Sequence, residues 1–204
     1  MGLERPPSPP APPPPPAPSL LTHLSAKPTP VSQPEPPTLG EAPPGAYLLE
    51  LLIYNGYPFK DHWAYCVRTQ EDSATVIKIH ATGNVREGFQ FEIKRCCDLC
   101  SNEERPTTRI PLQWVKAELI GDKDILFNHG VYKVVNAPVC EFEARLHSLA
   151  VPGKTLNDAR NAAHPGRKVI QRDCQTWILE SAAGLVQDGI MSVEAADYLR
   201  ALAQ

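Results

Sequence analysis

The sequence predicts an α+β domain behind a proline-rich tail, and three observations support this. Residues 1–46 contain 17 of the 23 prolines, and so proline-rich a segment cannot bury enough apolar surface to order itself. Short segments rich in β-branched and aromatic residues, separated by turn residues, then run from 47 to 135, as strands do. Helical apolar spacing follows near the C-terminus, and strands followed by helices indicate the α+β class.

The tail, residues 1–46, is expected to be disordered. Pro12 to Pro16 form an unbroken run, which favours polyproline II. Several P-x-x-P patterns could bind SH3- or WW-type domains. A solvated spacer is the simpler interpretation of such a composition. The folded part is therefore predicted to be one domain over residues 47–204.

Six strands are predicted before the first long helix. Turn residues at 55–58, 70–73 and 82–84 separate the first four, and a loop at 96–109 follows them. The expected strands are 47–54, 62–67, 74–81, 89–94, 110–115 and 130–135.

Three helices are predicted after the strands, and we expect an antiparallel sheet packed against those at the C-terminus. Pro138 opens the first, over about 139–149, and a polar loop at 151–167 follows. Asp173 and Ser192 are good N-cap residues for the other two, over 174–187 and 193–202.

Composition excludes several classes of protein. A net charge of −3 with no basic stripe argues against nucleic-acid binding. No apolar run reaches the ~20 residues that span a bilayer, and no basic segment followed by an apolar one suggests a secretory signal. We therefore expect six mostly free cysteines in a reducing compartment, by default the cytoplasm. No cofactor is expected.

Cys174 is the first candidate for chemistry. Its predicted place at the first helical position puts the thiol beside unpaired backbone N–H groups and the positive end of the helix dipole, which favour a thiolate. Trp177, Ile178 and Leu185 follow at helical spacing and would anchor the helix in a core. A lone cysteine of this kind is more often structural, so the assignment depends on a histidine partner.

Two histidines can supply that partner. His62 opens one predicted strand and His80 closes the next, so an antiparallel hairpin would bring them to the same end of a sheet. A thiol nucleophile needs a base within hydrogen-bonding reach, and the base needs an orienting group. Imidazole suits the first role because its pKa lies near neutrality, and a second imidazole can fill the other.

Three segments carry a resemblance to a known family. Residues 61–67 (Asp-His-Trp-Ala-Tyr-Cys-Val), 77–81 (Ile-Lys-Ile-His-Ala) and 172–177 (Arg-Asp-Cys-Gln-Thr-Trp) resemble the motifs of the lecithin:retinol acyltransferase-like family, within the NlpC-type superfamily. The nearest members by motif are its small phospholipase/acyltransferases. The resemblance implies a circularly permuted papain-like fold, with Cys174 as nucleophile, His62 as general base and His80 as the third, orienting member. It also implies an acyl-thioester on Cys174.

The chain departs from the family pattern at three points. Asp173 replaces the usual Asn, which raises the thiol pKa unless the carboxylate turns away to cap the helix. Residues 175–177 replace Glu-His-Phe, and the hydrophobic C-terminal membrane anchor of the animal phospholipase/acyltransferases is missing. The expected substrate is a small-molecule or lipid acyl compound, with peripheral membrane contact left open. A peptidase or isopeptidase, and a non-catalytic interaction module, remain alternatives.

Cys96, Cys97 and Cys100 are candidate zinc ligands by residue type. A tetrahedral site would need a fourth ligand, for which Cys140 or His129 are candidates, yet no spacing requires either. Free thiols on a loop are the preferred interpretation, and no metal site is predicted.

Overall fold

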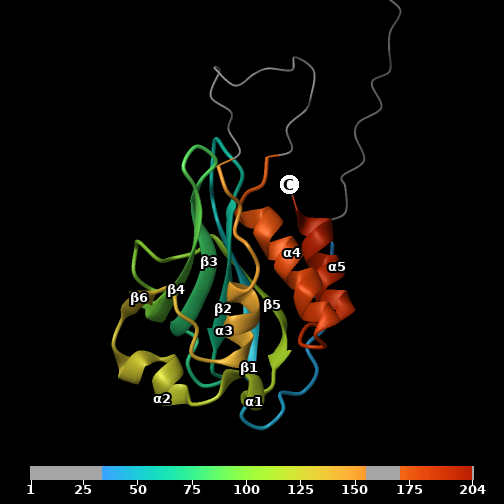
Figure 1. Ribbon diagram of the computed structural model, residues 1–204. Helices are drawn as coiled ribbons and strands as arrows, with labels where there is room; N and C mark the ends of the chain where they lie inside the picture. The colour runs from blue at the N-terminus through green and yellow to red at the C-terminus, as the bar shows by residue number, and fades with distance from the viewer. Residues whose placement is uncertain (1–33, 155–170, 204) are drawn as a thin grey trace, which may run out of the picture. The chain divides into compact units, whose positions relative to one another are not determined.

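One six-stranded antiparallel sheet organises the protein. The computed structural model describes residues 34–154 and 171–203, so predictions for residues 1–33 and most of the 151–167 loop lie outside the described residues. The strand order is β5-β1-β2-β3-β4-β6 (Figure 1). The strands are β1 (Tyr47–Tyr54), β2 (His62–Arg68), β3 (Thr75–Asn84), β4 (Gly88–Asp98), β5 (Thr108–Val115) and β6 (Lys133–Val135).

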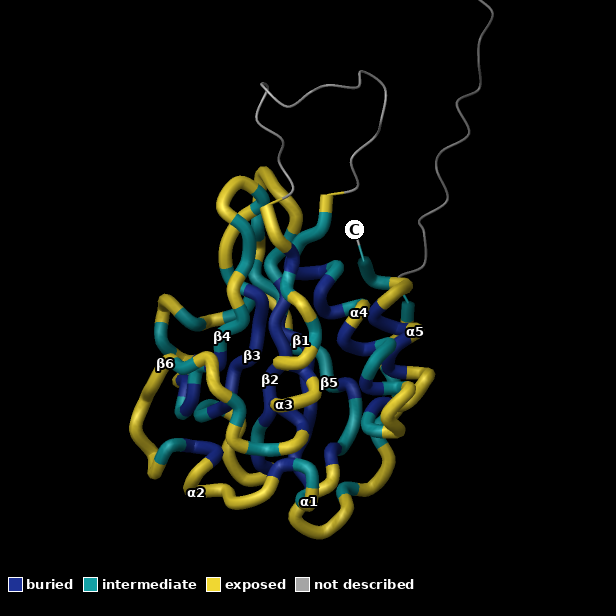
Figure 2. Tube along the Cα trace, viewed as in Figure 1, coloured by how far each residue is buried: buried dark blue, intermediate teal, exposed yellow. Residues whose placement is uncertain are grey.

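The C-terminal helices cover one face of this sheet. Helices α4 (Cys174–Gln187) and α5 (Val193–Leu202) lie side by side beside it, and their inward surfaces are buried (Figures 1 and 2). Helix α3 (Glu141–His147) also contributes to the core through Phe142 and Leu146, both fully buried. The expected arrangement of antiparallel sheet and C-terminal helices is confirmed.

Strand alternation gives the sheet two different faces. On β2, Trp63, Tyr65 and Val67 belong to the large core that includes α4 and α5. Their neighbours Ala64 and Cys66 belong to a smaller apolar cluster on the opposite face. The two histidines of interest fall on the side of the smaller cluster by the same alternation.

Several element boundaries differ from the prediction. Strand β4 continues to Asp98, so Cys96 and Cys97 lie in a strand rather than in a loop. Strand β6 begins only at Lys133, because a 3₁₀ turn over Asn128–Gly130 precedes it. Two four-residue helices were not predicted, α1 (Ala117–Ile120) and α2 (Lys123–Leu126). Each is too short to show an apolar period.

The end of the predicted tail contacts the domain. Residues 34–46 form no helix or strand, yet Trp114 Nε1 donates a hydrogen bond to the Gly40 carbonyl at 3.1 Å. Ala46 is only 4% exposed. The folded unit therefore includes at least part of the segment that composition assigns to the tail.

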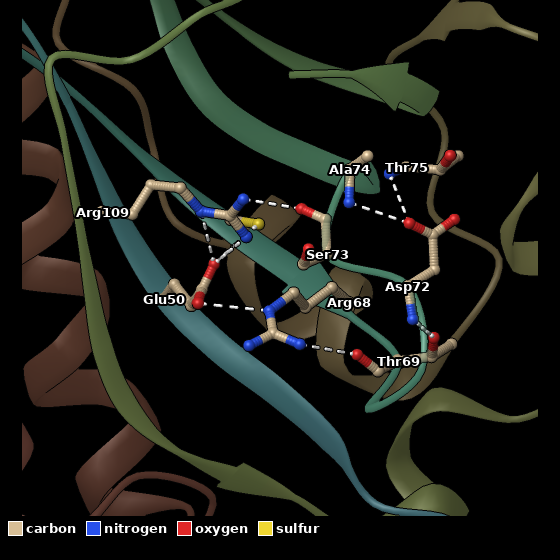
Figure 3. A network of polar contacts seen from close by, with 9 residues as sticks. Glu50, Arg68, Thr69, Asp72, Ser73, Ala74, Thr75 and Arg109 are labelled. Atoms are coloured by element: carbon tan, nitrogen blue, oxygen red, sulfur yellow. Dashed lines mark hydrogen bonds and ion pairs between the residues drawn. The ribbon is translucent and has the colours of Figure 1, made fainter. Parts of the chain in front are cut away.

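A buried carboxylate joins β1, β2 and β5 (Figure 3). Glu50 is 3% exposed, and it accepts from Arg68 Nε at 3.2 Å and from Arg109 Nε at 3.0 Å. The Cys66 thiol donates to the same carboxylate at 3.6 Å, and burial raises the pKa of that thiol well above its usual value. Both guanidinium groups also donate to backbone carbonyls, of Thr69 and Ser73. Cys66 is thus a structural residue.

A second buried ion pair fastens β4 to α3. Arg95 and Glu143 are 3% and 0% exposed and form two parallel hydrogen bonds of 2.8 Å each. Arg95 also donates to the carbonyl of Leu126, and Glu143 accepts from the Val139 N–H. This bidentate geometry satisfies both charges in the interior.

Candidate active site

Cys174 lies at the first position of α4, as predicted. The preceding Asp173 is the N-cap and accepts from the Thr176 N–H at 2.9 Å. The Thr176 hydroxyl accepts in return from the Asp173 N–H at 3.3 Å, which completes a capping box. The capping role expected of Asp173 is therefore confirmed, and it fixes the start of the helix at the cysteine.

Three contacts fasten the start of α4 to the start of β2. Gln175 Nε2 donates to the Asp61 carbonyl at 2.9 Å, and Lys60 Nζ lies 3.4 Å from Asp173 Oδ2. The third involves the nucleophile candidate itself, because the Trp63 backbone N–H is close enough to the Cys174 thiol to lower its pKa. That N–H belongs to the peptide unit that follows His62, so the thiol and the imidazole flank the same peptide.

The structure also brings the two histidines together. His62 Nε2 and His80 Nδ1 are 2.7 Å apart, and the ring centroids are separated by 5.0 Å in an edge-to-face arrangement. His62 is the first residue of β2, where it is paired with Tyr54 of β1. The expectation that a hairpin of β2 and β3 places both imidazoles at the same end of the sheet is borne out by this distance.

The pairing of β2 with β3 stops short of this end of the sheet. The pairs between the two strands run from Val67 with Ile77 to Tyr65 with Ile79. Trp63 lies beyond the last pair, so its N–H is available to the Cys174 sulfur. Cys174 belongs to the core on the α4 face of the sheet, whereas His62 and His80 fall on the face of the smaller cluster.

A carboxylate that the sequence analysis did not single out extends the histidine pair. Glu92 of β4 is directly opposite His80 in the ladder, and its Oε1 is 3.0 Å from His80 Nε2. Only the pairing of β3 with β4 reveals it, since Glu92 otherwise alternates with Phe91 and Ile93 like any solvent-facing residue. His62, His80 and Glu92 thus form a continuous line of hydrogen bonds across three strands.

Burial keeps both imidazoles neutral at pH 7. It lowers the pKa of His62 to about 4, and the neighbouring His80, Lys78 and Lys94 act in the same direction. Burial likewise lowers the pKa of His80, against the opposing effect of the Glu92 hydrogen bond. A neutral imidazole has a free lone pair, which is the form that a proton acceptor requires.

The thiol of Cys174 is also neutral at rest. Burial raises its pKa, and the Asp173 carboxylate raises it further, although the N–H groups of Trp63 and Gln175 oppose this by stabilising the thiolate. Asp173 therefore has both effects considered from the sequence: it caps the helix and it disfavours the thiolate. The resting pair is thiol with imidazole, and the proton must move during attack.

An open cavity of about 610 Å³ borders the far end of the histidine line. Glu92 is one of its walls, and most of the others are apolar. Phe91, which lines the cavity, packs edge-to-face on His147 at 5.1 Å and on Trp177 of α4 at 5.9 Å. The remaining lining residues are Phe89, Gln90, Val134, Val135, Asn136 and Val151.

The other sequence candidates take no part in this arrangement. Cys97 is buried in the smaller cluster, Cys96 is half-buried with a φ of 51°, and Cys100 is exposed. Among the side chains of residues 34–154 and 171–203, no three His, Cys, Asp or Glu residues are grouped to hold a metal ion. The helices within these same ranges include none with the length and apolar character to cross a bilayer.

Fold and geometry together define an α+β protein with a helix-terminal cysteine beside paired strand histidines. Residues 49–192 match the family of unknown function DUF6540, so the chain belongs to that family. Comparison with curated proteins and with solved structures found no match.

Proposed function

We propose that this protein is a cysteine-dependent hydrolase or acyltransferase with a circularly permuted papain-like fold. Cys174 is the nucleophile, His62 the general base and His80 the group that orients it. One arrangement carries the proposal: the backbone N–H that follows His62 lowers the pKa of the Cys174 thiol, and His62 Nε2 lies 2.7 Å from His80 Nδ1. The order His, His, Cys along the chain supports the permutation.

The reaction follows from the neutral resting state. The thiol proton of Cys174 passes to His62 while the sulfur attacks the carbonyl carbon of the substrate. The bond from that carbon to the leaving oxygen or nitrogen then breaks, and His62 returns the proton to the leaving group. Water, an amine or an alcohol next attacks the acyl-thioester, gives its proton to His62 and releases Cys174, which regains its proton.

An apolar acyl substrate is favoured by the loop that leads into His62. Tyr57 and Phe59 are 88% and 84% exposed, although the loop around them is well fixed. The Gly56 N–H donates to Asp61 Oδ1 at 3.1 Å, and the Phe59 N–H donates to the Gly56 carbonyl at 2.7 Å. Two aromatic rings held in water beside a site suit a lipid or another apolar acyl group, because aromatic side chains favour such interfaces.

The direct test is to trap the acyl-enzyme. Purified full-length protein is incubated with a p-nitrophenyl ester of a medium-chain fatty acid, and peptides are analysed by mass spectrometry. We expect acyl addition at Cys174 in the wild type and its loss in Cys174→Ala. Cys140→Ala is the matched control, since Cys140 is a half-buried cysteine at the start of another helix, where it is the N-cap of α3. Equal acylation of the Cys174→Ala variant would reject the proposal.

The substrate class needs its own experiment. A Tyr57→Ser/Phe59→Ser variant is compared with the wild type on phospholipid vesicles and on a short water-soluble ester. We expect about a tenfold loss on vesicles and little change on the soluble ester, because only the first substrate presents an apolar surface. Equal effects on both would instead favour the peptide or isopeptide substrates, which are assayed alongside.

One observation favours a second function, that of a non-catalytic interaction module. Cys174 is only 7% exposed, and burial raises its pKa. Both features are also those of an inert structural cysteine. Iodoacetamide separates the two functions: a module would leave Cys174 unlabelled in the folded protein at every pH up to about 10, whereas the enzyme would be alkylated there increasingly as pH rises.

A further inference from the structure

We propose that Glu92 is a positioning residue that sets the tautomers of both histidines, so that Nδ1 of His62 is the proton acceptor for Cys174. This deepens the proposed function and rests on it only for the role of the base. The assignment of protons follows from the hydrogen bonds together with an ionised Glu92 and neutral imidazoles.

The Glu92 carboxylate determines which nitrogen of His80 carries the proton. An ionised carboxylate only accepts hydrogen bonds, and the hydrogen bond from His80 keeps the pKa of Glu92 below its usual range. His80 Nε2, 3.0 Å away, must therefore carry the proton. Since His80 is neutral, its Nδ1 has the free lone pair and can only accept.

His80 in turn determines which nitrogen of His62 carries the proton. His62 Nε2 is 2.7 Å from His80 Nδ1, so His62 Nε2 must be the donor. A neutral His62 protonated at Nε2 has its lone pair at Nδ1. Two hydrogen bonds thus transmit the acceptor character of one carboxylate across three strands, and they leave the base in the form that can take a thiol proton.

Without Glu92, nothing in the hydrogen bond between His62 and His80 would determine which ring donates and which accepts. His62 and His80 share one hydrogen bond, which forms equally well with either ring as donor. If His80 Nδ1 were the donor, His62 would accept at Nε2 and carry its proton at Nδ1, where it could not accept another. A hydrogen-bond partner on the far side of a functional histidine, which fixes its tautomer, is a general device of enzyme sites.

The groups around the line do not supply this function. Lys78 and Glu104 form an ion pair, and Lys94 pairs with the same Glu104 carboxylate. Lys94 Nζ lies 3.9 Å from Glu92 Oε1, and the Tyr54 ring packs 5.9 Å from that of His62. The lysines favour neutral imidazoles, but among the residues that the structure describes only Glu92 accepts from a ring nitrogen at the end of the line.

Nitrogen NMR of the imidazoles tests the assignment without any substrate. In the ¹⁵N-labelled full-length protein at pH 7, both histidines should show a protonated Nε2 and an unprotonated Nδ1. In Glu92→Leu we expect the Nδ1–H form of His62 to rise about threefold or more, since the direction of the line is lost. Glu118→Gln, which alters an exposed carboxylate of α1, should leave both tautomers unchanged.

Two results would overturn the proposal. One is an unprotonated Nε2 on His80 in the wild type, and the other is a wild-type tautomer pattern in folded Glu92→Leu. If the leucine variant does not fold, Glu92→Lys gives the test, because an ammonium can only donate and would reverse both hydrogen bonds. The Nδ1–H form of His62 must then increase.

An activity measurement separates this proposal from the proposed function. Acylation of Cys174 should slow about tenfold or more in Glu92→Leu, and the loss should follow the fraction of His62 in the Nδ1–H form. If the tautomers change in Glu92→Leu but Cys174 is never acylated in any variant, the positioning role of Glu92 is supported and the proposed enzymatic function is rejected. Acylation that persists with unchanged tautomers would support the enzyme and reject the positioning role.

Discussion

The Arg95–Glu143 pair and the line from His62 to Glu92 are both polar groups inside the protein, yet they are built differently. Arg95 and Glu143 meet in two parallel hydrogen bonds, and backbone groups take up their remaining capacity. The histidine line has two neutral rings, with the Glu92 carboxylate at one end and Nδ1 of His62, the proposed proton acceptor, at the other. We call the ion pair a closed arrangement and the histidine line an open one.

This difference separates structural from chemical polar groups. In the closed ion pair both carboxylate oxygens of Glu143 accept from the Arg95 guanidinium, so no free base remains to take a proton. In the open line Nδ1 of His62 is the proposed proton acceptor, and Asp61 and Trp63, on either side of His62, adjoin Gln175 and Cys174 at the start of α4. Mutations should therefore affect mainly stability in the first region and mainly chemistry in the second.

The largest effect is expected from opening the closed pair. Arg95→Met leaves the Glu143 carboxylate buried without its partner and should lower the free energy of unfolding by about 3–5 kcal/mol. Urea denaturation measures this loss. The double variant Arg95→Met/Glu143→Leu should recover much of it, because no charge then remains buried. If the single variant were as stable as the wild type, the pair would have no structural role.

His62→Gln should instead reduce catalysis strongly and stability only slightly. We expect acylation of Cys174 to slow about 10²–10³-fold, since general base catalysis is lost. Urea denaturation should show a change of less than about 1 kcal/mol at pH 7, because His62 is only half-buried. Acylation at the wild-type rate would show that His62 is not the base.

Acidification should destabilise the protein through the histidine line. The pKa of His62 is lowered to about 4, so between its ordinary value of 6.5 and 4 the unfolded chain binds a proton that the folded one does not. Stability is then unaffected above pH 6.5 and falls as pH decreases through this window, by an amount on the order of 2 kcal/mol. His80 acts in the same direction. The measurement is urea denaturation at several pH values, with a smaller decrease expected for His62→Gln.

The smallest change in stability is expected for Asp173→Asn. An asparagine caps a helix about as well as an aspartate, so unfolding should change by no more than about 0.5 kcal/mol. The pKa of Cys174 should fall because a neighbouring carboxylate is removed. Alkylation by iodoacetamide should accordingly shift to lower pH, whereas Asp188→Asn, at the opposite end of α4, should leave the profile unchanged.

Local signals were sufficient for many elements and for the two histidines. β1, α4 and α5 have the bounds predicted from apolar period and N-cap residues. His62 and His80 were placed together because a short hairpin constrains two strand ends strongly. Catalysis by these residues stays a prediction, and so does the permuted papain-like topology.

Glu92 could not be found because the turn between β3 and β4 was misplaced. A turn at residues 82–84 would put His80 opposite Arg86, whereas β3 continues to Asn84 and pairs it with Gly88. The centre of the hairpin moves by three residues, and His80 then faces Glu92. The glycine at 83, with a φ of 133°, gave a turn signal although it lies within a strand.

The alternation of β2 has a consequence for how this protein tolerates insertions. Trp63 anchors the main core and His62 points to the other face, so the strand register fixes both at once. Adding one residue between Tyr65 and Val67 would turn either the core half of the strand or the histidine half to the wrong side. The same addition in the exposed turn at residues 70–73 would change neither. Length variation among functional variants of this chain should therefore be confined to such turns and be absent from β2.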